Sequence, residues 1–228
     1  MESHKRSSSL AVWHIALLTL VGVIFFWFFP LKLIVRLAAR YGRASKYRSS
    51  LSWLVHNPIR RWYMRNILDG VGVKPGETVL ELGCGPRALT IQAAQRLGPA
   101  GKLIVVDKSP YRIAQAERRV HQAGLTNVEF RAADPYHLPI DDESVDRVML
   151  VTVLPEIDDQ AHALAELRRV LKPAGLLSIT EEFIDPDYQF PREMARLAQA
   201  AGFSPERKTG SFWVYTLNFW KGEGIAYG

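Results

Sequence analysis

Two closely spaced glycines follow a short apolar run, and an acid stands just before them. In the stretch TVLELGCGP, Glu81 lies two residues before Gly83, and Gly85 follows after one residue. Glycines let the backbone turn tightly and let a ligand approach it closely. A carboxylate beside them suits a ligand with a cationic group. The spacing Gly83-x-Gly85-x-x-Ala88 also fits a dinucleotide fingerprint, which binds a pyrophosphate at a helix N-terminus, so an NAD site is an alternative.

Short apolar runs alternate with helical patterns after Asn66. The apolar runs predict strands at residues 78–82, 102–106, 128–131, 145–151 and 176–180. The stretches between them predict helices at residues 88–97, 110–123 and 160–171. Alternating strands and helices imply right-handed crossovers and a parallel sheet, and ligands of such a sheet bind beyond the carboxyl ends of its strands.

The C-terminal part departs from this alternation. A helix is predicted at residues 191–201, and two further strands are predicted at residues 206–208 and 211–221. These strands, joined around Thr209 and Gly210, predict an antiparallel hairpin on one edge of the sheet. The plain dinucleotide-binding fold lacks such a hairpin.

The glycine segment and the acid before it resemble the first motif of the class I S-adenosylmethionine-dependent methyltransferases. The resemblance continues for about 150 residues, through VVD at 105–107, ADP at 133–135, SVD at 144–146 and RVLKPAG at 169–175. Within that family, the chain is most similar to quinone-biosynthesis C-methyltransferases and phospholipid N-methyltransferases. The resemblance implies a Rossmann-like α/β fold, with a mainly parallel seven-stranded sheet and a C-terminal antiparallel hairpin. A transmembrane helix is expected before this fold, on the grounds of the apolar N-terminal segment described below.

The same resemblance implies a site for S-adenosylmethionine. Asp107 matches the acid that bonds the ribose hydroxyls, and Asp134 matches the position that contacts the adenine amine. The cofactor-binding residues that it implies are Glu81, Gly83, Cys84, Gly85, Asp107, Lys108, Ala133 and Asp134. Many members of the family have a third glycine where this chain has Arg87, whose guanidinium is suited to pair with the cofactor carboxylate or to point to solvent.

Cys84 is the only cysteine in the chain. It therefore forms no intrachain disulfide and no cysteine-based zinc site, and no metal site is predicted. Methyl transfer from a sulfonium needs no covalent enzyme intermediate, so Cys84 is expected to pack as a small apolar residue. The several thiols used for arsenite methylation in the resembling family are also missing.

An apolar segment near the N-terminus is long enough to cross a bilayer. Residues 7–31 contain no Lys, Arg, Asp or Glu, and the twenty residues 10–29 are almost wholly apolar. Twenty helical residues rise about 30 Å, the thickness of the hydrocarbon core. A spanning helix is predicted; the alternatives are a helix lying in the membrane interface and a cleaved signal peptide. The predicted organisation is a tail and transmembrane helix (1–31), a basic amphipathic linker with N-terminal helices (32–68) and a methyltransferase domain (69–228).

The basic residues concentrate around this segment. Residues 1–68 carry a net charge of +10, whereas residues 69–228 carry −4. More basic residues follow the apolar segment than precede it, so the positive-inside rule predicts a single-pass protein with its catalytic domain in the cytoplasm. The stripe of Lys32, Arg36 and Arg40 predicts contact with anionic lipid headgroups. Nucleic acid is not an expected partner, because the basic residues do not surround the acceptor cleft.

The acceptor is expected beyond the carboxyl ends of the later strands, where candidate catalytic groups occur. Glu156 follows the fourth predicted strand, and Tyr136 and His137 follow Asp134. Glu181 and Glu182 follow the fifth strand and form an acidic cluster with Asp185 and Asp187. The cluster is suited to attract a cationic headgroup, but plain surface charge is the simpler interpretation. A quinol carbon needs a base to remove a proton, whereas a neutral amine does not.

These patterns predict a membrane-anchored enzyme that transfers a methyl group from S-adenosylmethionine to a lipophilic acceptor, either a phospholipid amine or an isoprenoid quinone. A membrane anchor gives such an enzyme local concentration and orientation. Two alternatives remain: a catalytically degenerate membrane scaffold with the same fold, which need not bind the cofactor, and a methyltransferase for a small molecule.

Overall fold

The chain divides into two compact units, residues 1–51 and 52–228. A computed structural model describes the following residues: 13, 14, 17–19, 21, 22, 66–85, 89–183, 185 and 187–222. Those of the first unit are helical and exposed. In the described part of the chain, no helix has both the length and the apolar character needed to cross a membrane. Most of the predicted spanning segment, all of the basic stripe and Arg87 lie outside the described residues, so the transmembrane helix stays an unsupported prediction.

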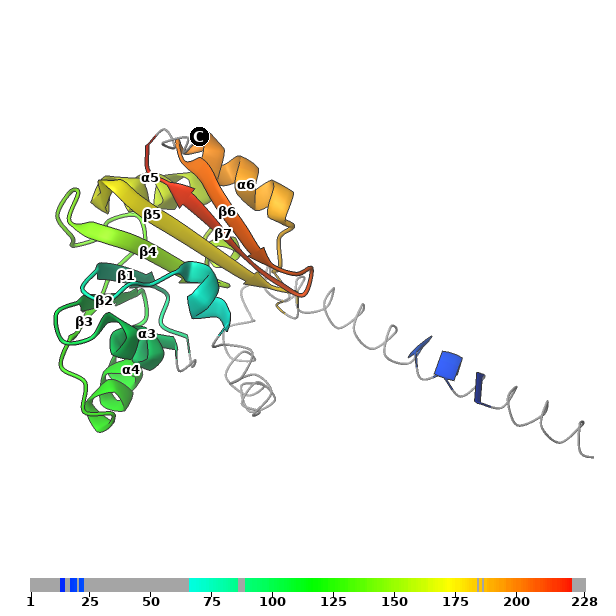
Figure 1. Cartoon of the computed structure of the whole chain (residues 1–228), viewed down its shortest axis with the longest axis horizontal. Coiled ribbons are helices and arrows are strands. Elements are labelled where there is room, and N and C mark those ends of the chain that lie inside the picture. The colour runs from blue at the N-terminus through cyan, green and yellow to red at the C-terminus, as the bar shows by residue number, and fades with distance from the viewer. Residues whose placement is uncertain are drawn as a thin grey trace, which may run out of the picture. The chain divides into compact units, whose positions relative to one another are not determined.

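The second unit is built on one seven-stranded sheet with the order β3-β2-β1-β4-β5-β7-β6 (Figure 1). Its strands are β1 Thr78–Leu82, β2 Lys102–Asp107, β3 Val128–Ala132, β4 Val145–Val151, β5 Leu171–Glu182, β6 Ser204–Gly210 and β7 Val214–Trp220. The connecting helices are α3 Leu89–Leu97, α4 Pro110–Gln122, the short 3₁₀ helix η2 Leu154–Glu156, α5 Gln160–Val170 and α6 Pro191–Ala200. Every strand and helix predicted for residues 78–221 is therefore present.

The sheet is mixed, which corrects the prediction of a mainly parallel one. The pairs β3–β2, β2–β1, β1–β4 and β4–β5 are parallel, whereas β7 runs antiparallel to both β5 and β6. β5 also begins earlier than the predicted residue 176, because Leu171 already pairs with Val145 before the register shifts at Arg147. The predicted hairpin exists, and its turn lies between Gly210 and Val214.

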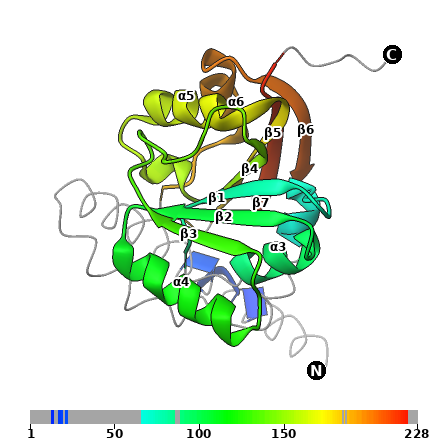
Figure 2. The ribbon, with the colours of Figure 1, turned by 90° about the vertical axis from the view of Figure 1, so that its left-hand side faces the viewer.

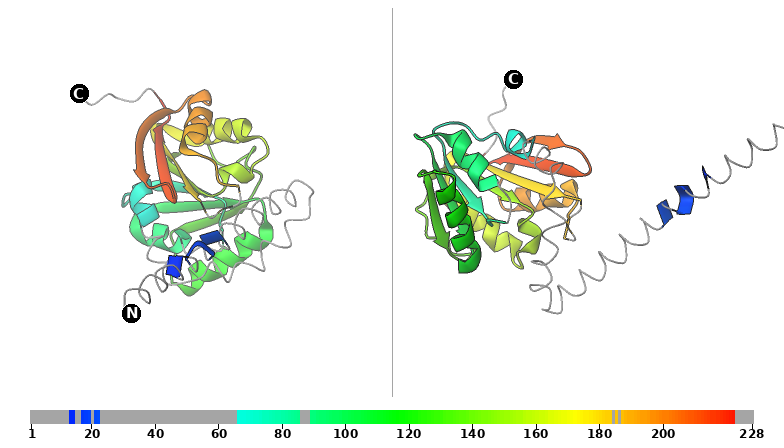
Figure 3. Two further views of the ribbon diagram at one scale, coloured as in Figure 1. Left: turned by 90° about the vertical axis from the view of Figure 1, so that its right-hand side faces the viewer. Right: turned by 90° about the horizontal axis from the view of Figure 1, so that it is seen from below.

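Helices cover both faces of the sheet, as Figure 2 and Figure 3 show. On one face, α3, α4 and the helical residues 66–71 bury an apolar cluster that includes Leu68, Leu89 and Ile113. On the other face, α5 and α6 bury a second cluster that includes Leu167 and Met194. Because the central strands are covered on both sides, their side chains are almost continuously apolar. β5 and β7 depart from this pattern, because Ser178 and Thr180 pair with Asn218 and Thr216 in the middle of these strands.

The carboxyl ends of the parallel strands share one edge of the sheet. The parallel registers pair Leu82 of β1 with Val106 of β2, and Asp107 of β2 with Ala132 of β3. The β6–β7 turn reaches the same edge, because Val214 pairs with Glu182 at the end of β5. This edge, called the carboxyl edge below, carries the candidate site.

Candidate active site

Gly83 forms a tight turn directly after β1. Its φ is +83°, and its N–H donates to the Val106 carbonyl oxygen at 2.7 Å. A Cβ atom at this position would lie 2.5 Å from Val153 Cγ2, which is closer than real Cβ contacts. Both the backbone conformation and the contact therefore require glycine. The predicted role of Gly83 as a turn residue agrees with this geometry.

Val153 is held against the glycine turn by a strained neighbour. Thr152, the residue after β4, is buried and has a φ of +52°. A β-branched residue rarely adopts this conformation, and strain of this kind concentrates at functional sites. The Thr152 N–H donates to the Thr180 carbonyl oxygen at 2.8 Å, which fixes the turn to β5. The segments after β1 and β4 are thus packed together at the carboxyl edge.

Asp107 ends β2 with an oriented, buried carboxylate. Its side chain is 3 % exposed, and Oδ1 accepts from the Ser109 N–H at 2.8 Å. Arg112 Nη1 lies 3.7 Å from Oδ2, and Cys84 Sγ donates to the same oxygen at 3.8 Å. Ser109 also caps α4 by accepting from the Arg112 N–H. The start of α4 therefore positions the Asp107 carboxylate beside the glycine turn.

Cys84 lies between two acids and is protonated. Burial, the Asp107 charge and the Glu81 charge together raise the pKa of the Cys84 thiol to about 12. The side chain is 2 % exposed. The structure thus agrees with the prediction of a packing role, and the high pKa argues against a thiolate nucleophile.

We expect Cys84 to resist alkylation in the native protein. Iodoacetamide at pH 8 should modify it only after denaturation, because the thiol is buried and its pKa lies well above that pH. Mass spectrometry of native and urea-treated samples measures the modified fraction. Rapid native labelling would contradict the burial and the raised pKa.

The other predicted cofactor residues lie on the same edge. Glu81 is 7 % exposed and belongs to β1, between β2 and β4. The Ala133 N–H donates to the Asp107 carbonyl oxygen at 3.1 Å, and Asp134 follows as an exposed residue. Lys108 is exposed as well. Acidic side chains thus follow one another along β1, β2 and the end of β3.

Tyr136 and His137 are brought together with a third ring, His162. The Tyr136 and His162 rings stack at 5.1 Å, and His137 meets His162 edge-on at 5.8 Å. The Tyr136 hydroxyl accepts from the Asp159 N–H at 3.0 Å, at the start of α5. This contact gives Tyr136 a positioning role in the loop. The half-buried Glu156 lies in η2, the segment after β4.

Glu181 and Glu182 are not surface residues, which corrects the simpler interpretation of the acidic cluster. They are 0 % and 2 % exposed and belong to the last two positions of β5. Glu181 is paired in register with Tyr215. Burial, followed by the Glu181 charge, raises the pKa of Tyr215 far above its usual range. These carboxylates therefore belong to the interior of the carboxyl edge.

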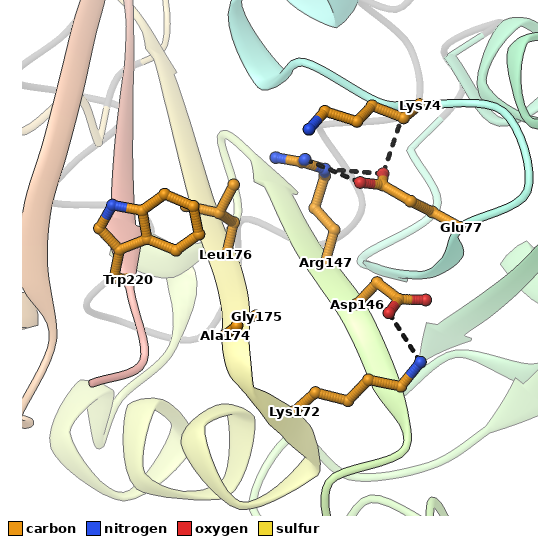
Figure 4. Close-up of a pocket in the computed structure, with 9 residues that line it drawn as sticks. All are labelled: Lys74, Glu77, Asp146, Arg147, Lys172, Ala174, Gly175, Leu176 and Trp220. Atoms are coloured by element: carbon orange, nitrogen blue, oxygen red, sulfur yellow. Dashed lines mark hydrogen bonds and ion pairs between the residues drawn. The ribbon is translucent and has the colours of Figure 1, made fainter. Parts of the chain in front are cut away.

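A surface pocket of about 310 Å³ lies at the opposite edge of the sheet (Figure 4). Its charged side chains are largely paired with one another. Arg147 donates two hydrogen bonds to the Glu77 carboxylate, each 3.0 Å long, and Lys172 forms an ion pair with Asp146 at 2.6 Å. The bond from Arg147 Nη1 to the Val71 carbonyl oxygen, at 2.8 Å, ties the helical residues 66–71 to the sheet. We assign these charges to folding rather than to chemistry.

Several residues of the site escaped sequence reasoning. Nothing in the sequence marks Val153 as the residue that packs on Gly83, or His162 as a neighbour of Tyr136. Arg112 carried a usable signal, because Ser109-Pro110 is typical of a helix start and places Arg112 in the first turn. Its contact with Asp107 follows from that position.

Comparisons with known proteins identify the domain. Residues 73–212 match the family described as "Methyltransferase domain". The chain belongs to this family. It is 39 % identical over 107 residues to the arsenite methyltransferase of Halobacterium salinarum, covering 47 % of this chain and 27 % of that protein. It is 35 % identical over 127 residues to the demethylmenaquinone methyltransferase of Bacillus cytotoxicus, covering 56 % and 52 %.

The fold of the methyltransferase is also found among solved structures. A SAM-dependent methyltransferase from Aquifex aeolicus superposes with a TM-score of 0.64 at 24 % identity, covering 68 % of this chain and 87 % of that one. This likeness shows the fold. The chain spans about half or less of the length of the curated relatives that it matches.

The chain therefore carries a methyltransferase domain, and the residues of the carboxyl edge fit S-adenosylmethionine as its cofactor. The ammonium and sulfonium groups of this cofactor are cationic, and the edge offers the acids Glu81 and Asp107. These acids lie beside the Gly83 turn, where a Cβ atom would clash with Val153. Exposed Asp134 stands past β3, where the resemblance places the adenine amine. When bound, the cofactor supplies an electrophilic methyl group. The residues of the edge would hold and orient the cofactor for transfer.

Replacing Asp107 by asparagine should weaken cofactor binding by roughly 10- to 100-fold, since hydrogen bonds to a charged group contribute about 1.5–3 kcal/mol. Calorimetric titration with S-adenosylmethionine measures this. Asp146→Asn is the matched control: its carboxylate accepts from the Thr78 N–H at 2.8 Å and Lys172 at 2.6 Å, but at the opposite edge. Equal losses in both variants would remove Asp107 from the cofactor site.

Proposed function

We propose that this enzyme methylates a lipophilic acceptor, and that the acceptor is an isoprenoid quinol-type ring rather than a phospholipid amine. The observation that carries the proposal is the similarity to enzymes of quinone biosynthesis. Besides the Bacillus relative, the chain is 33 % identical over 139 residues to a protein named ubiquinone/menaquinone biosynthesis C-methyltransferase from Hahella chejuensis. The twenty-residue apolar segment 10–29 supports a membrane-held acceptor.

We also propose that residues 10–29 anchor the chain as a single span, with the catalytic domain on the cytoplasmic side and anionic headgroups as partners of the flanking basic residues. The support comes from the sequence, which carries +10 over residues 1–68 and −4 over the rest. Protease protection in oriented membrane vesicles tests it. In right-side-out vesicles, cleavage of the catalytic domain only after the membrane is permeabilised would support this topology. Release of the protein from the membrane by alkaline carbonate would contradict the span.

Transfer to a ring carbon sets a requirement that transfer to an amine does not. The carbon attacks the methyl group, the bond between methyl and sulfur breaks, and the ring proton must leave to a base. Glu156 is our first candidate, because η2 holds it half-buried just after β4, next to the segment that packs on Gly83. His137 is the second candidate, and Tyr136 serves mainly to position the loop.

Glu156→Gln should lower the rate of methyl transfer by roughly 100-fold or more, within the range that one general base contributes. Cofactor affinity should stay unchanged, since the amide keeps the volume of the side chain. His137→Gln and Tyr136→Phe serve as comparison variants in the same assay. Unchanged turnover in Glu156→Gln with a loss in His137→Gln would transfer the role to the histidine.

Arsenite is a second candidate acceptor, favoured by the relative from Halobacterium salinarum. The only thiol of the chain argues against it. Cys84 is buried, protonated and bonded to Asp107, so it offers no set of thiolates for arsenic. We therefore rank it below the quinol.

The experiment uses the full chain in detergent, S-adenosylmethionine with a labelled methyl group and a total membrane lipid extract. Label in the organic phase, on a product that chromatographs as a quinone, supports the proposal. Label on phospholipid would shift the acceptor to an amine. Label only on water-soluble molecules would overturn the lipophilic acceptor and leave a small-molecule methyltransferase.

A further inference from the structure

An aromatic cluster gathers at the carboxyl edge, beyond the residues assigned above. It consists of Phe183, Tyr188, Phe190, Phe212 and Trp213, which we call the aromatic rim. The rim joins three segments: the end of β5, the loop before α6 and the β6–β7 turn. Figure 1 shows these segments meeting at one end of the hairpin. None of the five residues takes part in the proposed chemistry.

Three of the five rings of the rim are exposed, whereas Tyr188, like most large apolar residues of the domain, is buried. Phe190, Phe212 and Trp213 are 55 %, 51 % and 65 % exposed. Between residues 66 and 222, the described chain has only one other exposed large apolar side chain, Tyr111 on α4. A contiguous apolar patch on an otherwise polar surface marks an interaction site rather than chance exposure.

The backbone holds these rings in place. The Phe183 N–H donates to the Trp213 carbonyl oxygen at 2.8 Å, and the Tyr188 hydroxyl donates to the Phe212 carbonyl oxygen at 3.1 Å. The Phe183 and Phe212 ring centroids are 4.7 Å apart. The exposed rings are therefore presented by a fixed scaffold, and contact with a partner costs little ordering entropy.

A lipid bilayer fits this surface better than another protein does. Tryptophan and phenylalanine rings settle at the boundary between headgroups and hydrocarbon, and the rim displays such rings on a projecting turn. The same chain carries a twenty-residue apolar segment and eleven Lys and Arg within its first 68 residues, so a membrane is within reach. A methyl acceptor dissolved in that membrane would enter at the edge that the rim borders.

We propose that the aromatic rim inserts into the interfacial layer of a lipid bilayer and turns the carboxyl edge of the sheet toward the membrane. The advantage of this arrangement rests on the proposed lipophilic acceptor. The insertion itself is a separate physical claim, and it is tested without activity.

Spin labels report the insertion directly, because buried Cys84 leaves an introduced cysteine as the reactive one. Labels are placed through Trp213→Cys and, in a second variant, Phe190→Cys. Thr126→Cys is the control, an exposed residue before β3 at the opposite edge. The full chain is bound to vesicles of phosphatidylcholine and phosphatidylglycerol, and power saturation compares collisions with oxygen and with a water-soluble nickel complex.

We expect the ratio of oxygen to nickel collisions to rise several-fold at positions 213 and 190 when vesicles are added, and to stay constant at 126. Unchanged ratios at both rim positions on vesicle-bound protein would overturn the insertion. Spin–spin broadening at 213 without vesicles would also overturn it, and would assign the rim to a second copy of the chain.

The two proposals fail separately in this design. Immersed rim labels together with transfer only to water-soluble acceptors would refute the lipophilic acceptor and keep the insertion. Transfer to quinone with rim labels that stay in water would refute the insertion and keep the lipophilic acceptor. The double variant Phe212→Ser/Trp213→Ser adds a test of function. It should keep the cofactor affinity and lower the rate of methyl transfer to a vesicle-embedded acceptor several-fold. An unchanged rate of transfer would contradict a role of the rim at the membrane.

Discussion

Replacing Gly83 by alanine should weaken binding of S-adenosylmethionine by roughly 100-fold or more, the penalty for displacing a site by about 1 Å. The new methyl group would lie 2.5 Å from Val153 Cγ2, and alanine at a φ of +83° is itself strained. Val153 cannot retreat easily, because Thr152 is bonded to β5 through its N–H. The glycine turn must therefore move, and with it the main chain that the cofactor approaches. Calorimetric titration measures the affinity.

Two further variants separate the contact from the backbone strain. Gly124→Ala introduces alanine at a φ of +70°, where nothing lies within 4 Å, so it should cost about 1 kcal/mol of stability and no cofactor affinity. Gly83→Ala/Val153→Ala removes the clashing methyl groups and should recover part of the lost affinity. If the second substitution recovers nothing, the contact is not the cause and the strain at Gly83 is.

The elements of the domain were predictable because each one has a clear local pattern. β1 and β4 begin and end at the predicted residues, since each is marked by a short, mostly apolar run, as expected for buried strands of a covered sheet. β5 was predicted too short because the residues KPAG of positions 172–175 are poor strand formers. Here pairing with β4 at Leu171 overrides the local preference.

The candidate site was predictable only where a charged or polar side chain lies at the end of a predicted strand. Glu81 and Asp107 could be placed at one edge by topology alone. The burial of Glu181 and Glu182 could not, because it depends on β7 and on segments far away in the chain. The same holds for the aromatic rim, whose rings come from three segments that only the tertiary structure brings together.

The two edges of the sheet have different roles: the carboxyl edge carries the candidate site, and the opposite edge stabilises the fold. The carboxyl edge holds a strained threonine, a left-handed glycine and buried acids, none of which favours stability by itself. The opposite edge holds paired charges that tie strands and helix together. We therefore expect substitutions at the opposite edge to change stability and to leave cofactor affinity in place.

Arg147 gives the strongest test of that division. Its guanidinium is 3 % exposed and donates to both oxygens of Glu77 and to the Val71 carbonyl oxygen. Arg147→Met should lower the free energy of unfolding by about 3–5 kcal/mol, because it leaves a partly buried carboxylate and a carbonyl without their donor. Domains of this kind are stable by only about 5–15 kcal/mol, so the loss should be visible as a large fall in the urea midpoint.

The control for Arg147 is an ion pair of similar length at the surface. Lys102 Nζ lies 2.6 Å from Glu129 Oε2, but its side chain is 52 % exposed. Lys102→Met should therefore cost no more than about 1 kcal/mol. Cofactor affinity of the folded Arg147→Met protein should match the parent, since the pair lies at the edge away from Gly83. A loss of stability no greater than that of Lys102→Met would mean that solvent reaches the Arg147 pair, and a loss of affinity at full stability would mean that the two edges are coupled.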